Sequence, residues 1–179
     1  MARMFRFLTA DEIEVKVKQV RENGLVCLLY KTARTDMDLL DETVGAGNWT
    51  NDYKEIKGNL YAGIGIIQEN GSTQWKWDCG IESREDEEGN QKKGEASDAF
   101  KRAGFRWGIG RELYTSPFVW IPSNKAEIKE SSFNGKTRFN CYDKFSVEKI
   151  AYDEKTGRIT GLAIRNDTKN LRAFVWQQS

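Results

Sequence analysis

The segment from Lys93 to Tyr114, KGEASDAFKRAGFRWGIGRELY, constrains the fold of this chain more than any other stretch. It is predicted to form one helix, because its apolar residues recur at the three- and four-residue spacing of an amphipathic helix. The apolar stripe consists of Ala96, Ala99, Phe100, Ala103 and Trp107. Such a stripe needs a sheet or a second helix to cover it.

The other side of this predicted helix carries Lys101, Arg102 and Phe105, with Arg106 at its flank. Cations beside an exposed aromatic suit a phosphate backbone with bases next to it. A plainer interpretation is that Lys101 and Arg102 only solvate a surface helix, as charged residues commonly do. Phe105 either stacks on bases or packs against a neighbouring subunit. The residues alone leave these alternatives open.

Three strand candidates precede the helix, and they span Trp49–Lys57, Leu60–Gln68 and Thr73–Ile81. Asn70-Gly71 between the last two is the strongest hairpin signal in the chain. In the third strand, Trp75 and Trp77 belong to an apolar set that alternates with polar residues, which predicts that both tryptophans are in the core. We therefore expect an α+β fold in which an antiparallel β-meander packs against the long helix.

The remaining segments predict further elements on both sides of this core. Thr9-Ala10-Asp11-Glu12 is a capping box and predicts a helix to about Arg21. A strand is expected over Leu25–Lys31, a short helix over Thr35–Val44, and a C-terminal β-hairpin block over Thr137–Tyr152, Arg158–Arg165 and Leu171–Trp176. The predicted domains are a core at 1–124 and a small β-rich subdomain at 125–179.

Composition excludes several classes of function. The chain of 179 residues has no histidine, which removes histidine-based catalysis and nearly all zinc sites. Three widely spaced cysteines without a CxxC pair indicate reduced thiols in a cytosolic compartment. The N-terminal residues lack the apolar core of a signal peptide, and no apolar run reaches membrane-spanning length, so a cytoplasmic protein without a membrane partner is expected.

Two further motifs could suggest a bound ligand. Gly104, Gly108 and Gly110 do not have the spacing of a phosphate-binding loop and predict close packing and a helix stop instead. Arg111, beside Gly110, is kept as a candidate DNA contact. The acidic run from Glu82 to Glu88 fits a solvated loop better than a magnesium site, so no metal or cofactor is expected.

Three segments, in this order, resemble the Rad52 family of single-strand annealing proteins, and phage members of the Sak type in particular. They are TADEI at Thr9–Ile13, MDLLDETVGAGNW at Met37–Trp49 and ASDAFKRAGFRWG at Ala96–Gly108. The resemblance covers about Thr9 to Tyr114, and its helix motif is the most specific part.

This resemblance implies a ring-forming protein without enzymatic activity, in which Lys101 and Arg102 line a groove that holds single-stranded DNA. The family also uses a basic residue just before the short helix, for which Arg34 and Lys31 are the nearest matches. Where the family often has a further arginine one helical turn after the pair, this chain has Phe105, followed by Arg106. An aromatic position of the family is Ala46 here.

We therefore expect a single-stranded DNA-binding and annealing protein of recombination and repair that acts as an ATP-independent homo-oligomer. A single-strand binding protein is a candidate partner, and the bacterial host cytoplasm is the expected location if the chain is phage-encoded. One alternative is a single-strand binding module that protects DNA without annealing it. A metal-dependent nuclease built on the acidic run is a weaker alternative.

Overall fold

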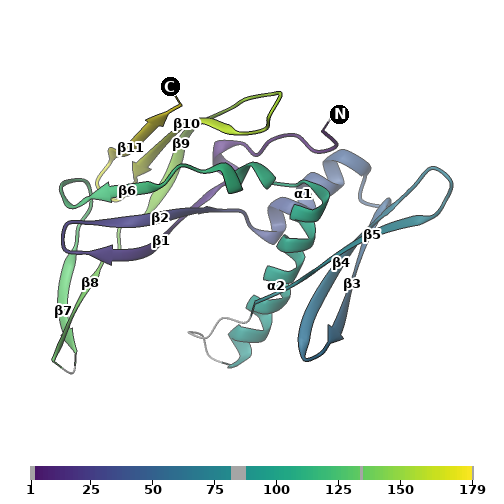
Figure 1. Ribbon diagram of the computed structural model, residues 1–179, viewed down its shortest axis with the longest axis horizontal. Helices are drawn as coiled ribbons and strands as arrows, with labels where there is room; N and C mark the ends of the chain where they lie inside the picture. The colour runs from purple at the N-terminus through teal and green to yellow at the C-terminus, as the bar shows by residue number, and fades with distance from the viewer. Residues whose placement is uncertain (1–2, 82–87, 134, 179) are drawn as a thin grey trace. The chain divides into compact units, whose positions relative to one another are not determined.

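The computed structural model describes residues 3–81, 88–133 and 135–178 (Figure 1). The chain divides into two compact units, and each unit combines segments that are distant in sequence. The first comprises Met1–Arg6 and Lys31–Arg111, and the second comprises Phe7–Tyr30 and Glu112–Ser179. The fold mixes helices with strands, and the strand pairings among the described residues are antiparallel.

The first unit contains a three-stranded sheet in the order β3-β4-β5. Its strands are β3 (Trp49–Ile56), β4 (Asn59–Ile67) and β5 (Thr73–Cys79). In the turn between β3 and β4, Lys57 and Gly58 have φ angles of 54° and 74°. Gly71, in the next turn, has a φ angle of 78°. Tight hairpins need such positive φ angles, which explains why the Asn70-Gly71 prediction located the second turn correctly.

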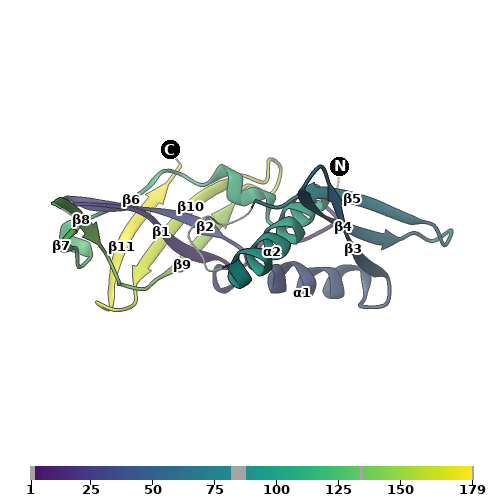
Figure 2. The same cartoon turned by 90° about the horizontal axis from the view of Figure 1, so that it is seen from below.

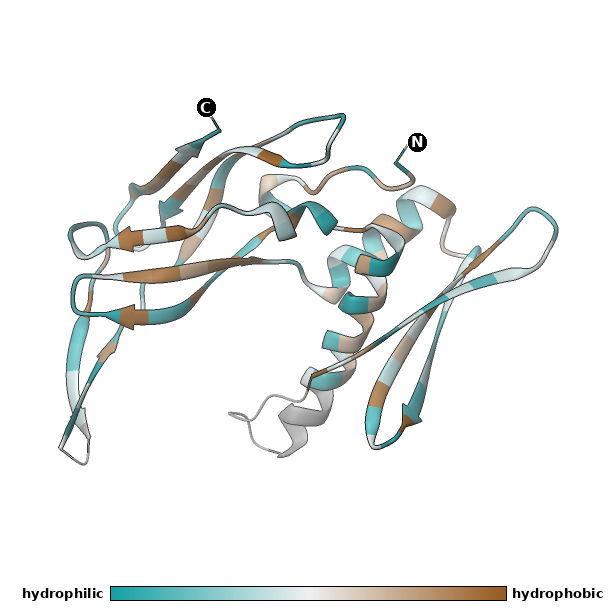
Figure 3. Cartoon of the chain, viewed as in Figure 1, coloured by the Kyte–Doolittle hydropathy of each residue, from teal (hydrophilic) through white to brown (hydrophobic). Residues whose placement is uncertain are grey.

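Helix α2 (Glu88–Trp107) packs against β4 and β5. The predicted apolar stripe supplies the contact, since Ala99, Phe100 and Ala103 are at most 1% exposed. The sheet residues beneath are Ala62, Ile64 and Ile66, and the Trp107 indole N–H donates to the Ile64 carbonyl at 2.9 Å. Figure 3 shows hydrophobic and hydrophilic segments alternating along α2, as expected of a helix with one covered face.

The long helix ends earlier than its predicted end at Tyr114. Gly108 adopts a φ angle of 100°, and its amide donates to the Phe105 carbonyl at 3.0 Å. The Ile109 amide donates to the Gly104 carbonyl, also at 3.0 Å. These two bonds form a Schellman motif, which closes a helix at a residue with positive φ. A 3₁₀ turn over Arg111–Thr115 follows.

Helix α1 (Ala33–Val44) confirms the predicted short helix. The Thr32 side chain accepts a hydrogen bond from the Thr35 amide at 3.1 Å and caps its first turn. Gly45, with a φ angle of 88°, ends it. Leu39 and Leu40 are fully buried. In Figure 2, α1 and the β3–β4–β5 sheet can both be followed beside α2.

The burial expected for the tryptophans of β5 is wrong. Trp75 is paired with Gly65 and Trp77 with Gly63, so both lie on the face opposite the buried Ile64. This face is not the one covered by α2, and Trp75 is 37% exposed. The polar residues of the same alternation, Lys76 and Asp78, point instead to the side of α2. Lys76 contacts the Arg106 carbonyl and the Trp107 ring there, and Asp78 pairs with Arg102 and Arg106.

The second unit contains a six-stranded sheet in the order β11-β10-β9-β1-β2-β6 and a two-stranded sheet of β7 and β8. Its strands are β1 (Glu14–Arg21), β2 (Gly24–Tyr30), β6 (Val119–Pro122), β7 (Lys129–Phe133), β8 (Lys136–Asn140), β9 (Phe145–Tyr152), β10 (Ile159–Asn166) and β11 (Leu171–Gln177). The C-terminal strands expected from the sequence are therefore present, although the first predicted one is divided into β8 and β9. Short 3₁₀ turns lie at Ala10–Glu12 and Ser123–Lys125.

The helix predicted from Thr9 to Arg21 is wrong. The capping box forms, with the Thr9 amide donating to the Glu12 carboxylate at 2.8 Å, but it starts only the 3₁₀ turn that precedes β1. A bulge in β1 explains the error, because it lies between Val17 and Gln19 and shifts the register. Val17 pairs with Cys27 and Val20 with Leu25, so residues three apart share one face and imitate helical spacing.

The two compact units divide the chain differently from the domain boundary expected at residue 124. β1 and β2 precede the first unit's sheet in sequence, yet they pair with β9 and β6 in the second unit. Pairing between distant segments cannot be read from local composition, which is what suggested that boundary. No helix within the described residues has the length and apolar content that crossing a membrane requires.

Candidate nucleic-acid interface

Five cations gather around the last two turns of α2. We call this set the basic face, and it consists of Lys76, Lys101, Arg102, Arg106 and Arg111. The side chains of Lys101 and Arg102 are 20% and 39% exposed, and that of Arg106 is 63% exposed. The helix thus keeps its cations at the surface while the stripe through Ala99 and Ala103 is buried.

Two carboxylates hold the basic face in place. Asp78 on β5 accepts from Arg106 Nε at 2.9 Å and lies 3.5 Å from Arg102 Nη2. Asp98 lies 3.7 Å from Lys101 Nζ, one turn before it on α2. Five cations against two carboxylates leave this surface with an excess of positive charge. The small net charge of the whole chain does not reveal this local excess of positive charge.

The pKa of Asp78 reflects its place between two guanidinium groups. Partial burial acts to raise the pKa of this carboxyl group. The Cys79 amide and Arg106 donate hydrogen bonds to it, and together with the charge of Arg102 they hold its pKa below the usual value. Asp78 is therefore ionised at neutral pH and orients both arginines along α2.

Arg111 and Lys76 are engaged at the C-terminal end of α2. Arg111 donates through Nη2 to the carbonyls of Phe105 and Arg106, at 2.8 and 3.0 Å. Lys76 donates to the Arg106 carbonyl at 3.1 Å, and its ammonium lies 4.3 Å from the centre of the Trp107 ring. Cations at this end also interact favourably with the helix dipole. Arg111 thus caps the helix, a role that its position beside Gly110 did not reveal.

Lys31 occupies a different environment from the rest of the predicted set. It is 3% exposed, and its ammonium lies 2.5 and 2.6 Å from the two carboxylate oxygens of Asp36. It also donates to the Lys101 carbonyl at 3.0 Å. Because its charge is used within the fold, this placement speaks against Lys31 as a phosphate ligand. Arg34 is exposed in the first turn of α1 and is the better match for the basic residue before the short helix.

Phe105 covers the Lys31 ammonium, which lies 4.1 Å from the centre of its ring. Its side chain is half-buried rather than fully exposed. The helical wheel placed Phe105 opposite the apolar stripe, and this internal partner was not foreseen. The cation–π contact gives the residue a third role beside base stacking and subunit packing.

Asp36 completes this buried cluster. It is fully buried, and burial raises the pKa of its carboxyl group to about 6, against the opposing effects of the charge and the hydrogen bond of Lys31. At Gly104 of α2, an added Cβ would lie 2.9 Å from Asp36 Oδ2. The glycine therefore lets α1 approach α2, as the sequence predicted for this position in general terms.

Sequence reasoning missed the anionic and backbone partners of these cations. Asp78 and Lys76 belong to the polar set of β5, which was assigned to solvent. Asp36 lies two residues after Arg34 and gave no signal beyond helical spacing. Only the pairing of strands and the packing of α1 on α2 bring these groups together.

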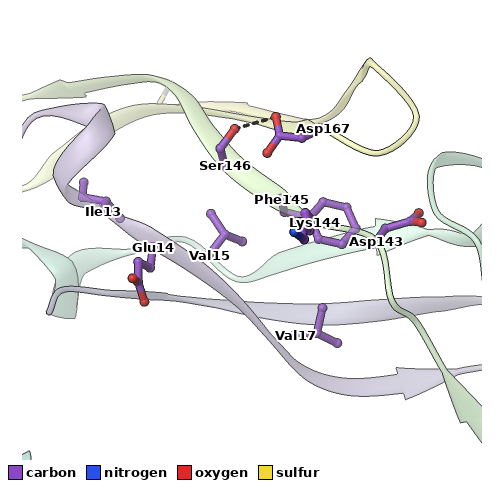
Figure 4. A pocket seen from close by; sticks show the side chains of 9 residues that line it. All are labelled: Ile13, Glu14, Val15, Val17, Asp143, Lys144, Phe145, Ser146 and Asp167. Atoms are coloured by element: carbon purple, nitrogen blue, oxygen red, sulfur yellow. Dashed lines mark hydrogen bonds between the residues drawn. The ribbon is translucent and has the colours of Figure 1, made fainter.

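A cavity of about 480 Å³ opens in the second unit where β1 and β9 diverge (Figure 4). The two strands are paired at a single described position, Glu14 with Ser146. The Ser146 hydroxyl donates to Asp167 at 2.8 Å, and Asp143 accepts from Asn166 at 2.7 Å. The predicted DNA-binding residues do not line this cavity. We assign no function to it.

Acidic and cysteine side chains do not converge on a metal site in the part of the chain that the structure describes. Within residues 3–81, 88–133 and 135–178, histidine, cysteine, aspartate and glutamate form no group of three or more that could hold a metal ion. The side chains of the acidic run from Glu82 to Glu88 lie outside the described part of the chain.

Comparison with known proteins gives one family. No curated protein and no solved structure gives a significant match to the chain. The model of the Rad52/22 family double-strand break repair proteins matches residues 3–132, which is well over half of the chain and includes α1, the β3–β4–β5 sheet and α2. The chain therefore belongs to the Rad52/22 family, which places it in DNA double-strand break repair and recombination.

Proposed function

We propose that the chain binds single-stranded DNA through the basic face of α2 and anneals complementary strands without ATP. The observation that carries this proposal is the surface position of Lys101 and Arg102, held by Asp98 and Asp78 on a helix whose other side is buried. Helix α2 packs against β4 and β5 and carries both cations, which supports their acting together.

The physical mechanism needs no bond chemistry. Cations of the basic face neutralise phosphates of one strand and release the counterions condensed on it. The ion pairs with Asp78 and Asp98 limit the side-chain rotamers, so less conformational entropy is lost when a phosphate binds. Bases held unstacked can pair with a second strand, and duplex stacking of about 1.4 kcal/mol per step then drives annealing.

Homo-oligomerisation is part of this proposal. β3 and β5 are the edge strands of a three-stranded sheet, and each has one side without a strand partner among the described residues. Open strand edges invite pairing with another chain. An assembly of several copies would align basic faces along one DNA strand, and each copy would contribute its own Lys101 and Arg102.

The test is a double substitution, Lys101→Ala/Arg102→Ala, measured by anisotropy of a labelled single-stranded oligonucleotide across a salt series. We expect weaker binding to every sequence and a plot of log affinity against log salt that is flatter by about 0.7 for each phosphate that is no longer neutralised. Annealing, followed by fluorescence of two complementary labelled strands, should fall in parallel. Retained binding without annealing would favour the protection module instead.

The matched control is Lys155→Ala/Arg158→Ala. This pair removes the same charge from exposed residues in the turn between β9 and β10. It should leave affinity and salt slope close to those of the wild type. Light scattering on all three proteins should give the mass of an oligomer. The proposal fails if the α2 variant keeps its fold and mass and still binds and anneals like the wild type.

A further inference from the structure

The helix-free face of the β3–β4–β5 sheet carries an aromatic surface that the basic face does not explain. We call it the tryptophan platform, and it consists of Trp75 and Trp77 on β5 above Gly65 and Gly63 on β4. The strand register pairs each tryptophan directly with its glycine. The platform lies on the side of the sheet opposite Ile64, which is buried on the side of α2.

The two glycines allow the indoles to lie flat on the sheet. A Cβ atom at Gly63 would come within 2.6 Å of Trp77 ring carbons, and one at Gly65 within 2.9 Å of Trp75 Cε2. Side chains at these positions would lift the rings away from β4. The ring centres of Trp75 and Trp77 lie 5.4 Å apart, with 25° between their planes. The two indoles are therefore stacked in nearly parallel planes.

A cation lies beside this stacked pair. Lys54 on β3 lies on the same face of the sheet, and its ammonium is 4.2 Å from the centre of the Trp77 ring. Trp75, farther along β5, keeps 37% of its surface exposed. One indole is thus covered by a positive charge, while its neighbour presents an aromatic surface to solvent.

We propose that the tryptophan platform is a second contact site for single-stranded nucleic acid, at which Trp75 stacks on a base and Lys54 contacts a phosphate beside it. The inference rests on the proposed function, since it requires that the chain bind single strands. It adds a site on the face of the sheet opposite the one that α2 covers. Trp77 acts as a positioning residue that supports Trp75 and holds the Lys54 ammonium.

Shape and charge favour a nucleotide over a second protein chain as the occupant. A flat ring without protruding atoms matches the face of a base, and stacking of this kind tolerates any sequence. The Lys54 ammonium matches a phosphate, whereas a protein chain covering the same face would have to bury it together with the exposed Asp52. The exposed aliphatic residues of this face, Ile56 and Ile67, lie at strand ends.

The charges of this face predict how binding should depend on salt. Lys54 and Asp52 nearly cancel, so stacking must supply most of the affinity and the salt dependence should be small. The basic face of α2 should behave in the opposite way. The two sites can therefore be distinguished by measuring the binding affinity of variants of each site across one series of salt concentrations.

The experiment uses the full chain and an oligothymidylate, with binding followed by anisotropy and by quenching of tryptophan fluorescence. Trp75→Leu keeps an apolar side chain over Gly65 but cannot stack, and Trp75→Phe keeps a ring. We expect Trp75→Leu to weaken binding by about 5- to 150-fold with an unchanged salt slope. Trp75→Phe should recover most of that loss. Lys54→Ala should lower the salt slope by about 0.7.

Tyr142→Leu is the matched control, because Tyr142 is 74% exposed in the second unit and lies outside the platform. It should bind like the wild type. Wild-type affinity of Trp75→Leu would overturn the inference, and it would leave the proposed function intact if Lys101→Ala/Arg102→Ala still weakens binding. A fall in oligomer mass before any loss of DNA binding would also overturn it and identify the platform as a contact between copies. A wild-type chain that binds no single strand would overturn both.

Discussion

The buried pair of Lys31 and Asp36 gives a prediction that the sequence alone would not suggest. The Lys31→Met substitution keeps an unbranched side chain of similar length but removes the charge. Both partners are almost completely enclosed, with side-chain exposures of 1% and 0%. Asp36 would then be left buried without its cation, and breaking a buried pair in this way costs about 3–5 kcal/mol.

The same ammonium makes two further interactions that the substitution would remove. It donates to the Lys101 carbonyl at 3.0 Å and lies over the Phe105 ring. A hydrogen bond contributes about 0.5–1.5 kcal/mol, but contributions within one cluster are not additive. We therefore expect Lys31→Met to lower the free energy of unfolding by about 3–5 kcal/mol in total, a large part of the stability of a typical domain.

The double variant Lys31→Met/Asp36→Leu separates the charge from the packing. Leucine has the branched shape of aspartate, so it fills the space beside Gly104 without a charge. Replacing both members of a buried pair by apolar residues is commonly neutral or stabilising, so the double variant should be more stable than the single one. Urea unfolding followed by circular dichroism and tryptophan fluorescence measures both. The reasoning is refuted if Lys31→Met stays within about 1 kcal/mol of the wild type, or if the double variant is no more stable than the single one.

Two further predictions concern the same cluster. Gly104→Ala should destabilise the chain by about 1–3 kcal/mol, because its Cβ would press against the Asp36 carboxylate. Gly94→Ala in the same helix meets nothing within 4 Å and should stabilise it by about 0.5–1 kcal/mol, so thermal melts that place both variants on the same side of the wild type would contradict this account. The pKa of Asp36 is raised from 3.8 to about 6, so the folded state holds a proton that the unfolded state has released between these values. The stabilisation that the protonated Asp36 carboxyl gives to the folded state should be complete below about pH 4, and it should be lost as the pH rises through about 6. Urea titrations should thus show the wild type losing stability relative to Asp36→Asn across this window, and a constant or opposite difference would refute the assignment.

Local patterns predicted much of the first unit. Positive φ angles at Gly58 and Gly71 follow from residue chemistry within a few positions, whereas the helix expected to reach Tyr114 ends at Trp107. The apolar stripe of α2 could be recognised because its period belongs to one element and needs no knowledge of a partner. Because that stripe is the side of α2 that must be covered, Lys101 and Arg102 were expected on the other side of the helix. The order of elements and the surface position of both cations were therefore available from the sequence.

Pairing between distant segments decided the rest. The bulge in β1 gave Val17 and Val20 the spacing of a helix, and only the register with β2 shows that they share one face of a strand. Alternation in β5 showed that Trp75 and Trp77 share a face, but it could not say which face α2 covers. That choice depends on β4, where Ala62, Ile64 and Ile66 fit beneath the helix and the intervening glycines receive the indoles.

The sequence by itself determined which residues are cations, which are apolar, and which side of α2 each occupies, because these properties belong to single residues and to one helical period. Tertiary structure alone decided that Lys31 forms a buried ion pair with Asp36 while Lys101 and Arg102 remain at the surface. The free energy of a charge depends on what surrounds it. A lysine 70 positions away from its carbonyl partner finds that environment only when α1 packs against α2.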